Sequence, residues 1–416
     1  MEQDLCPNTL PSRAARGKRF AFPAAVTEWM VRVRRAVERV GTPCYVTAWA
    51  PMAAALARLD ALPSPLPIRS WFSFKTHPLL ALARQWLASG RGVEVVSERE
   101  LLAVLALNPP VDQLLVNGVA KHSWLQRHRL PRLRVHFDSV NEIDALLPNA
   151  LEERWRVGVR VQVPDEKDAR EPAFRGQFGL SRREAVAALF ELADAGADVQ
   201  SLHFHLGQHQ YQTGAYERAV DYVASVCADA GVVPLYLDCG GALPSAHDAR
   251  NGAAMDDLSR AIARAAERLP GLREIWLENG RFVCEPGTAL VVTVLDLKER
   301  PDSRYLICDG GRTNQALAAD VRPHPLMLVP SRDGAERLTT VCGPTCMADD
   351  RLGRWMLPEA LDIGDVIVWL DAGAYHLPWE TRFSFGLCPV VWFDAREQMS
   401  VARDREPVTA AAGATR

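Results

Sequence analysis

The chain lacks the features that mark membrane, nucleic-acid-binding and disulfide-rich proteins. No apolar run is long enough to cross a membrane, and the first residues mix charge, proline and polar side chains without the apolar core of a signal peptide. The formal net charge is only −3 over 416 residues, so neither sign predominates as it does in proteins that bind nucleic acid or acidic membranes. We therefore expect a small-molecule partner, no nucleic acid and no membrane.

The nine cysteines also form no framework. They show neither the CxxC spacing of a metal site nor the dense pattern of a disulfide scaffold. Scattered thiols of this kind are typical of a reduced protein, so we expect a cytoplasmic location and no metal.

What the sequence does have is an alternation of short β-rich runs and helical periods that begins at Ile68. Helices are predicted between the runs, for example over 98–107, 182–195, 216–230 and 256–268. Eight alternations predict a closed parallel (β/α)8 barrel of the α/β class rather than an open sheet. The eight predicted strands are 69–75, 93–97, 114–118, 133–139, 157–163, 202–207, 235–240 and 275–280.

The pattern changes after Pro286, where strands follow one another without helices between them. Runs at 291–295, 305–308, 338–341, 366–370 and 390–393 predict an all-β C-terminal domain, a sandwich or a small barrel. The run 43–47 could join this domain or lead into the first helix. The predicted domains are an N-terminal segment over 1–45, the barrel over 46–286, the β domain over 287–400 and a flexible tail over 401–416.

Several predicted barrel strands end in side chains suited to chemistry, and barrel enzymes keep their active sites at that end. A lysine amine, a histidine, a glycine pair, a carboxylate and a guanidinium would together suit an aromatic nitrogen heterocycle that carries a phosphate. The residues are Lys75, His205, Gly240 with Gly241, and Glu278 with Arg281.

In this order the motifs resemble the pyridoxal-phosphate-dependent decarboxylases of the alanine-racemase fold (fold type III), the ornithine/diaminopimelate decarboxylase family. The resemblance runs from about residue 40 to about 395. Further segments of the chain are similar to the family's other motifs. They are Asn117-Gly118 with Lys121, Arg160, Phe178-Gly179, Gly343-Pro344-Thr345-Cys346 and Gly373-Ala374-Tyr375.

The resemblance implies the cofactor pyridoxal 5′-phosphate and a role for each residue. Lys75 would hold the cofactor as a Schiff base, Glu278 would bond its pyridine nitrogen, and His205 would stack on its ring. Cys346 would protonate the carbon that loses CO2, and in the family this cysteine reaches the partner subunit's site, which implies a homodimer with shared active sites. The remaining cofactor-binding residues would be Arg160, Gly240, Gly241, Gly280, Arg281 and Tyr375.

The sequence departs from the family pattern at four positions, namely Gln208, Ala242, Asn279 and Met347. Met347 is the largest departure, because the family usually has an acidic residue there that reads the substrate's distal amine. An apolar side chain argues against free ornithine or diaminopimelate. We therefore predict a decarboxylase of secondary metabolism that acts on a siderophore-type, citrate-linked diamino acid, with Met347 and Arg322 as substrate-binding residues.

Other functions stay open from the sequence. The chain could decarboxylate a free diamino acid such as diaminopimelate or ornithine, or it could racemise an amino acid on the same fold. A non-catalytic regulator is a third alternative, against which intact Lys75 and Glu278 argue. Asp349, Asp350 and His376 lie near the motifs and could be solvated loop residues.

Overall fold

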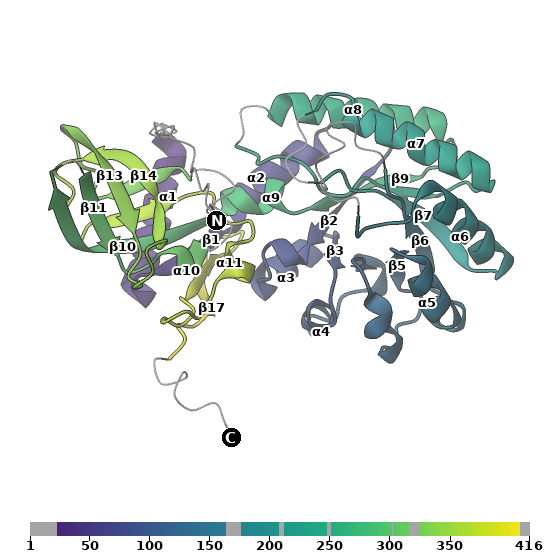
Figure 1. The fold of residues 1–416 in the computed structure, drawn as a ribbon, viewed down its shortest axis with the longest axis horizontal. Helices are drawn as coiled ribbons and strands as arrows, with labels where there is room; N and C mark the ends of the chain where they lie inside the picture. The colour runs from purple at the N-terminus through teal and green to yellow at the C-terminus, as the bar shows by residue number, and fades with distance from the viewer. Residues whose placement is uncertain are drawn as a thin grey trace, which may run out of the picture.

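The computed structural model describes residues 23–163, 176–207, 212–247, 251–301, 303–315 and 324–407. The chain forms two lobes, a barrel covered by helices and a lobe built mainly of strands (Figure 1). The helix α2 (Trp49–Asp60) leads from the strand-rich lobe into the barrel.

The barrel is closed by eight parallel strands, because the last of them pairs with the first. In chain order they are β2 (Ile68–Ser73), β3 (Gly92–Val95), β4 (Leu114–Val116), β5 (Arg134–Phe137), β6 (Arg156–Arg160), β7 (Asp198–His203), β8 (Tyr236–Asp238) and β9 (Glu274–Asn279). The covering helices are α3 (Leu80–Ala88), α4 (Glu98–Leu105), α5 (Val140–Glu152), α6 (Arg182–Asp194), α7 (Ala215–Ala230) and α8 (Asn251–Arg268). The predicted α/β barrel is thus confirmed.

Three of these helices begin with the same local signal, a serine followed three residues later by glutamate. Ser97, Ser139 and Ser181 each accept a hydrogen bond from the backbone N–H of that glutamate, at the starts of α4, α5 and α6. In α6 the Glu184 carboxylate also accepts a hydrogen bond from the Ser181 backbone N–H, which completes a capping box. These caps satisfy backbone donors that a helix start leaves open, and so they fix where each helix begins.

The predicted barrel strands overlap the observed ones but extend too far at their carboxyl ends, and the predicted strand 202–207 also starts four residues later than β7. The first strand ends at Ser73, so Lys75 lies in the following 3-10 turn, Phe74–Thr76, and not in the strand. Likewise β7 ends at His203, two residues before His205. Apolar and glycine residues continue past some strands, such as β7 and β8, whereas the strand pairing has already ended there.

The second lobe is a nine-stranded sheet with the main order β14-β13-β11-β10-β1-β16-β17, to which β12 and β15 attach. Its central strand β1 (Cys44–Ala48) comes from before the barrel, antiparallel to β10 and parallel to β16, so the run 43–47 belongs to this sheet. The other strands are β10 (Thr288–Arg300), β11 (Ser303–Cys308), β12 (Leu326–Val329), β13 (Glu336–Cys342), β14 (Arg351–Pro358), β15 (Val366–Trp369), β16 (Val390–Phe393) and β17 (Met399–Arg403).

The amino-terminal helix α1 (Pro23–Val40) also belongs to this lobe. Its buried side chains Trp29, Val33 and Ala36 pack against Val291 and Val391 of the sheet. The predicted boundary at residue 45 therefore falls inside β1.

The predicted flexible tail from 401 begins too early. β17 continues to Arg403, which donates to the Cys388 carbonyl, and Arg405 donates to the carbonyls of Val40 and Thr42. Three strands, β12, β14 and β17, were not predicted. Arginines interrupt β14, β17 has few apolar residues, and β12 is an apolar run of only four residues between Pro325 and Pro330. The remaining domain limits stay a proposal.

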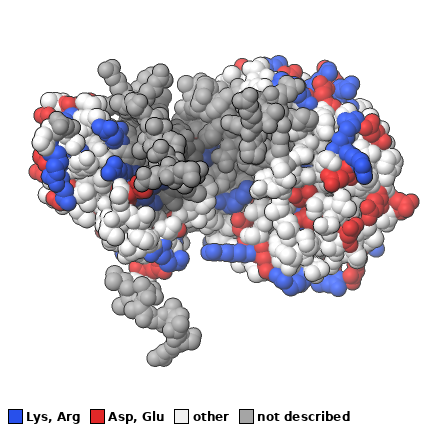
Figure 2. Space-filling view, in the orientation of Figure 1, with Lys and Arg blue, Asp and Glu red and all other residues white. Residues whose placement is uncertain are grey.

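The surface carries no field of one sign on the face shown in Figure 2, where basic and acidic side chains are interspersed over both lobes. Among the described helices none is long and apolar enough to cross a membrane. The eight cysteines within the described ranges are free thiols.

Candidate active site

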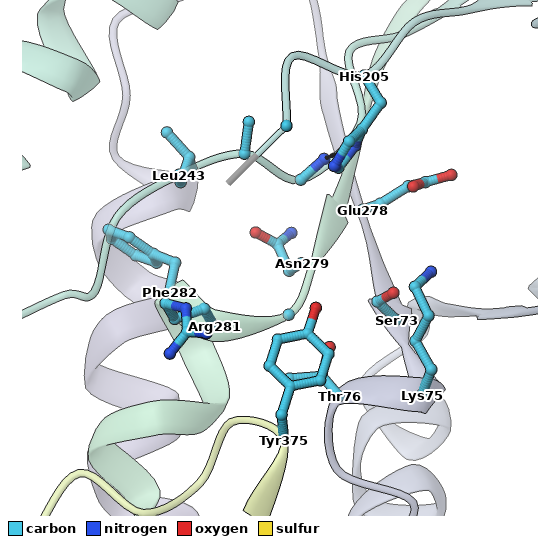
Figure 3. A pocket seen from close by; sticks show the side chains of 14 residues that line it. Ser73, Lys75, Thr76, His205, Leu243, Glu278, Asn279, Arg281, Phe282 and Tyr375 are labelled. Atoms are coloured by element: carbon cyan, nitrogen blue, oxygen red, sulfur yellow. Dashed lines mark hydrogen bonds between the residues drawn. The ribbon is translucent and has the colours of Figure 1, made fainter. Parts of the chain in front are cut away.

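A pocket opens at the carboxyl ends of the barrel strands and is completed by a loop of the second lobe. Figure 3 shows Lys75 and Glu278 on one side of it and Arg281 on the other, with the Tyr375 hydroxyl pointing into the space between them. The structure thus brings together residues that lie up to 300 positions apart in the chain. The predicted residues that line the pocket are Lys75, His205, Gly241, Glu278, Gly280, Arg281 and Tyr375.

Lys75 is held by a buried carboxylate. Its Nζ lies 2.9 Å from both carboxylate oxygens of Glu94, and Ser73 donates a 2.6 Å bond to the same carboxylate. The lysine side chain is 37% exposed and Glu94 is fully buried, so the amine faces the pocket while a fixed carboxylate holds it from behind. Burial opposes the charged amine, but Glu94 and Glu278 outweigh it and raise the pKa of Lys75.

Glu278 lies at the end of β9 and is almost completely buried. Asn117 donates a 2.5 Å hydrogen bond to its Oε1. Burial and the nearby Glu94 raise the pKa of Glu278 to about 7, while Lys75, Arg160 and Asn117 act in the opposite direction. The carboxyl group can therefore change its protonation state near neutral pH, as groups that take part in catalysis often do.

His205 stands over the glycine pair that follows β8. The backbone N–H of Gly241 donates a 3.2 Å bond to His205 Nδ1, and burial lowers the pKa of His205 to about 3, so the ring is neutral. A Cβ atom on Gly241 would lie 2.5 Å from the Glu278 carbonyl oxygen, and one on Gly240 would collide with the His205 ring. Only glycine fits between these groups, as expected for a close backbone cradle.

The opposite end of the pocket holds donors without acceptors. Arg281 is mostly buried, and its Nη2 has no hydrogen-bond partner within the described part of the chain. The buried Thr76 Oγ1 is in the same condition, and it lies 2.5 Å from where a Cβ on Gly280 would stand. With the Tyr375 hydroxyl, these groups form a donor set suited to an anion such as phosphate.

Tyr375 reaches the pocket because its loop is locked onto the barrel. Its backbone N–H donates 2.9 Å to the Thr76 carbonyl, and the Gly373 N–H donates 3.2 Å to the Glu285 carbonyl. A side chain at Gly373 would run into the Cys284 carbonyl, so glycine is required at this contact. The guanidinium of Arg281 lies 5.3 Å from the Tyr375 ring.

Four predicted residues within the described ranges lie outside the pocket lining, namely Arg160, Gly240, Cys346 and Met347, although Gly240 directly precedes the lining residue Gly241. Arg160 ends β6, where it pairs with Asp138 at 3.3 Å and covers the Phe178 ring at 4.7 Å. Cys346 and Met347 lie in the loop between β13 and β14, both exposed, with Met347 51% exposed. Arg322 falls in 316–323, outside the described residues.

The loop that carries Cys346 is built around a buried aspartate, so the suggestion that Asp350 is a solvated residue is wrong. Asp350 accepts bonds from the Thr345 N–H (2.9 Å), the Thr345 hydroxyl (2.6 Å) and the Arg312 N–H (2.7 Å). Asp349 is exposed, as suggested, whereas His376 is buried and bonds the Ala374 carbonyl at 3.2 Å.

Sequence reasoning missed Glu94 and Thr76. Glu94 had a signal, since a lone acidic residue inside the apolar run Gly92–Val95 has to face a cation in a buried strand. Thr76 had none, because its place in the pocket depends on the turn that follows β2.

Comparison with known proteins agrees with this geometry. Residues 53–285 match the family model described as pyridoxal-dependent decarboxylase, pyridoxal binding domain. The chain is 29% identical to a diaminopimelate decarboxylase of Deinococcus radiodurans over 351 residues, which cover 82% of this chain and 86% of that protein. It is 28% identical to a lysine/ornithine decarboxylase of Selenomonas ruminantium over 270 residues, which cover 63% and 66%.

Among solved structures, the diaminopimelate decarboxylase of Helicobacter pylori complexed with L-lysine has a TM-score of 0.76 at 19% identity and covers 91% of this chain and 98% of that one. This likeness concerns the fold.

The residues of the pocket fit the cofactor that the family name implies. A lysine amine, a buried carboxylate and a neutral imidazole line one side, and the partnerless Arg281 Nη2 and Thr76 Oγ1 line the other. Pyridoxal phosphate needs a group for its aldehyde, one for its ring nitrogen and several for its phosphate. The chain therefore belongs to the pyridoxal-dependent decarboxylase family and is a pyridoxal-phosphate-dependent decarboxylase.

Proposed function

We propose that this enzyme removes the α-carboxylate of a free diamino acid of the diaminopimelate, lysine or ornithine type. The observation that carries the proposal is the buried carboxylate of Glu278 in the same pocket as Lys75. When bound, pyridoxal phosphate accepts the electron pair that CO2 leaves behind, and a carboxylate that keeps the ring nitrogen protonated strengthens this effect. A racemase would weaken it by placing an arginine there.

Each residue of the pocket then has a task. Lys75 would hold the cofactor covalently and yield it to the substrate amine, and Glu94 would keep the released lysine amine in place during turnover. Neutral His205 would lie flat against the ring without competing for the ring proton. The phosphate would be held by Arg281, Thr76 and Tyr375, since the Gly241 N–H already donates to His205, while Arg160 would add positive potential near the ring.

Cys346 would supply the proton that replaces CO2 on the substrate carbon. In a single chain this thiol is exposed on the second lobe and does not line the pocket. We therefore propose a homodimer in which the loop 343–350 of one subunit completes the pocket of the other.

The substrate proposal is supported by the relatives, which are named diaminopimelate decarboxylase and lysine/ornithine decarboxylase. This favours the free diamino acid over the citrate-linked diamino acid that Met347 suggested. The conjugated substrate remains a second candidate, because an apolar and half-exposed Met347 next to Cys346 offers no charge to a distal amine.

A CO2-release assay of the purified, cofactor-loaded enzyme would decide between the two. We expect meso-diaminopimelate, lysine or ornithine to be turned over with a kcat/KM at least about tenfold above that of citrate-linked diaminopropionate. The reverse ranking would establish the conjugated substrate. Release of no CO2 from either class, with racemised amino acid recovered instead, would contradict decarboxylation itself.

A further inference from the structure

The barrel interior below the pocket contains a polar layer where barrels usually pack branched apolar side chains. Four ionisable side chains from four strands meet there, and all are buried. They are His136 of β5, His203 of β7, Asp238 of β8 and Glu278 of β9.

The two histidines form a stacked pair. Their ring centroids are 5.1 Å apart with an angle of 17° between the planes, and His136 Nε2 lies 3.0 Å from the Ser201 hydroxyl. Burial lowers the pKa of His136 to about 3 and that of His203 well below its ordinary value. Each ring is therefore neutral, with one nitrogen that donates and one that accepts.

Each histidine faces one carboxyl group. His203 Nε2 lies 3.6 Å from Glu278 Oε1, and His136 Nδ1 lies 3.9 Å from Asp238 Oδ2. Four atoms of this layer have no hydrogen-bond partner among the described residues. They are both ring nitrogens of His203, His136 Nδ1 and Asp238 Oδ2. Leaving so many buried polar atoms unpaired is costly, so a proton or a bound water has to be shared across these gaps.

The two carboxyl groups differ in their surroundings. Glu278 accepts from Asn117 and lies near the cations Lys75 and Arg160, which favour its charge. Within the described part of the chain Asp238 accepts one side-chain hydrogen bond, from the Gly240 N–H, and burial together with the nearby Glu278 raises its pKa well above the ordinary value. Of the two, Asp238 is the group that holds a proton more readily. The other charged or titratable groups facing this layer are Glu94, Lys121, Arg134 and His205.

We propose that the stacked His136–His203 pair divides the protons of the two carboxyl groups, so that Asp238 stays neutral and donates toward His136 while Glu278 keeps the charge. His203 and Asp238 would then be positioning residues that act through Glu278. The inference deepens the proposed function, because it rests on Glu278 meeting the cofactor's ring nitrogen.

One nitrogen or oxygen atom each of His136, His203 and Glu278 lies within 4.8 Å of the others, so the three side chains are also close enough to share a metal ion. Stacked rings direct their lone pairs side by side rather than at one point, and Lys75 and Arg160 already supply positive charge here. A proton arrangement therefore accounts for the cluster better than a metal does.

Infrared spectroscopy of the cofactor-free full chain tests the protonation directly, since a protonated carboxylic acid has a carbonyl band that a carboxylate lacks. At pH 8 we expect the wild type to show this band and Asp238→Asn to lose it. The matched control is Asp365→Asn, which removes a buried aspartate that pairs with Arg332 at 2.7 Å and should leave the band in place. A band that survives in Asp238→Asn, or is missing from the wild type, would overturn the proposal.

A second pair of variants tests the role of His203 through pH dependence. His203→Phe should move the acid limb of the cofactor-loaded enzyme's kcat/KM profile upward by about one pH unit, a tenfold loss on the acid side, because Glu278 loses a donor. His203→Asn, which keeps an N–H, should move it less. Equal shifts in both variants, or zinc bound stoichiometrically by the wild type but not by His136→Asn, would contradict the proton division.

The proposed role of Glu278 and the proposed proton division can be contradicted separately. If Glu278→Gln leaves turnover unchanged while the infrared result holds, the proposed role of Glu278 falls and the proton division stands. If Glu278→Gln is impaired but the band does not depend on Asp238, only the proton division falls.

Discussion

The barrel mouth and the loop 343–350 are both expected to act on the same substrate, yet they are built in opposite ways. At the mouth, Lys75, Glu94 and Glu278 are fixed by buried contacts within one chain. In the loop, only Gly343 and the anchor Asp350 at its two ends are buried, while Cys346 and Met347 are exposed. The difference is what the proposed dimer predicts, in which one chain builds the cofactor pocket and presents Cys346 to its partner.

The largest expected effect comes from the buried side of this comparison. Lys75→Ala should abolish covalent attachment of the cofactor and reduce turnover by at least roughly a thousandfold. It should also lower the free energy of unfolding by about 1–3 kcal/mol, since Glu94 loses its cation, although partial exposure of Lys75 moderates the cost. The visible absorbance of the bound cofactor and a denaturant melt provide the measurements.

The exposed Lys298→Ala is the control, because this lysine pairs only with Asp296 at 3.7 Å. It should leave both readouts unchanged. A normal borohydride-reducible adduct in Lys75→Ala would mean that another amine holds the cofactor.

Mixing two inactive variants would test whether the regions meet across subunits. Lys75→Ala and Cys346→Ala subunits, allowed to exchange, should regain about a quarter of wild-type activity, since half of the dimers would be mixed and each would hold one intact site. Native mass spectrometry of subunits that carry tags of different mass would verify exchange. Activity that stays at the level of the separate variants would place Cys346 within its own subunit's site.

Glu278→Gln should keep the cofactor bound but slow CO2 release about ten- to a hundredfold, because one charge-assisted hydrogen bond is lost. A steady-state assay with an absorbance check of cofactor content measures this effect. Unchanged turnover would mean that the Glu278 carboxylate does not face the ring nitrogen.

The same variant should also change the pH dependence of stability in the cofactor-free protein. The folded-state pKa of Glu278 is raised to about 7, above its value in the unfolded chain, so its charge destabilises the fold at higher pH and not at pH 5. At pH 8, Glu278→Gln should therefore raise the free energy of unfolding by on the order of 1–3 kcal/mol, and the Tm with it. The gain should shrink toward pH 5. Thermal melts at the two pH values check the sign.

A smaller effect is expected in the loop. Asp350→Ala removes the acceptor of three donors, so the loop should lose its shape and kcat should fall about tenfold while cofactor absorbance stays normal. Asp349→Ala, at the exposed neighbour, is the control. Equal losses in both variants would show that Asp350 does not specifically position Cys346.

The smallest effect should come from Met347. If free diamino acids are the substrates, Met347→Asp should raise kcat/KM for them only a few-fold, because a half-exposed charge is screened by water. A large gain, with loss of activity on citrate-linked substrates, would instead favour the conjugated substrate. The assay is the CO2-release comparison already described.

The sequence predicted the barrel well because its signal is local and repeated eight times. It also predicted Lys75, His205, Glu278 and Arg281 in the pocket, since motif order places them just at or after strand ends. What it could not predict depends on three-dimensional contacts. Glu94 accepts hydrogen bonds from Lys75 only when β3 lies beside β2, and Asp350 becomes an anchor only when its loop folds around it. β17 was missed because only pairing with β16 identifies that half-exposed run as a strand.

The position of β1 in the middle of the second sheet has a consequence for synthesis. Its two neighbours β10 and β16 begin at Thr288 and Val390, so this apolar strand emerges from the ribosome long before either partner exists. At ordinary rates of translation the delay amounts to roughly ten seconds to a minute, during which the barrel can fold while β1 has both edges unpaired. The nascent chain is therefore most vulnerable to aggregation in that interval, and a chaperone that shields residues 44–48 would act there.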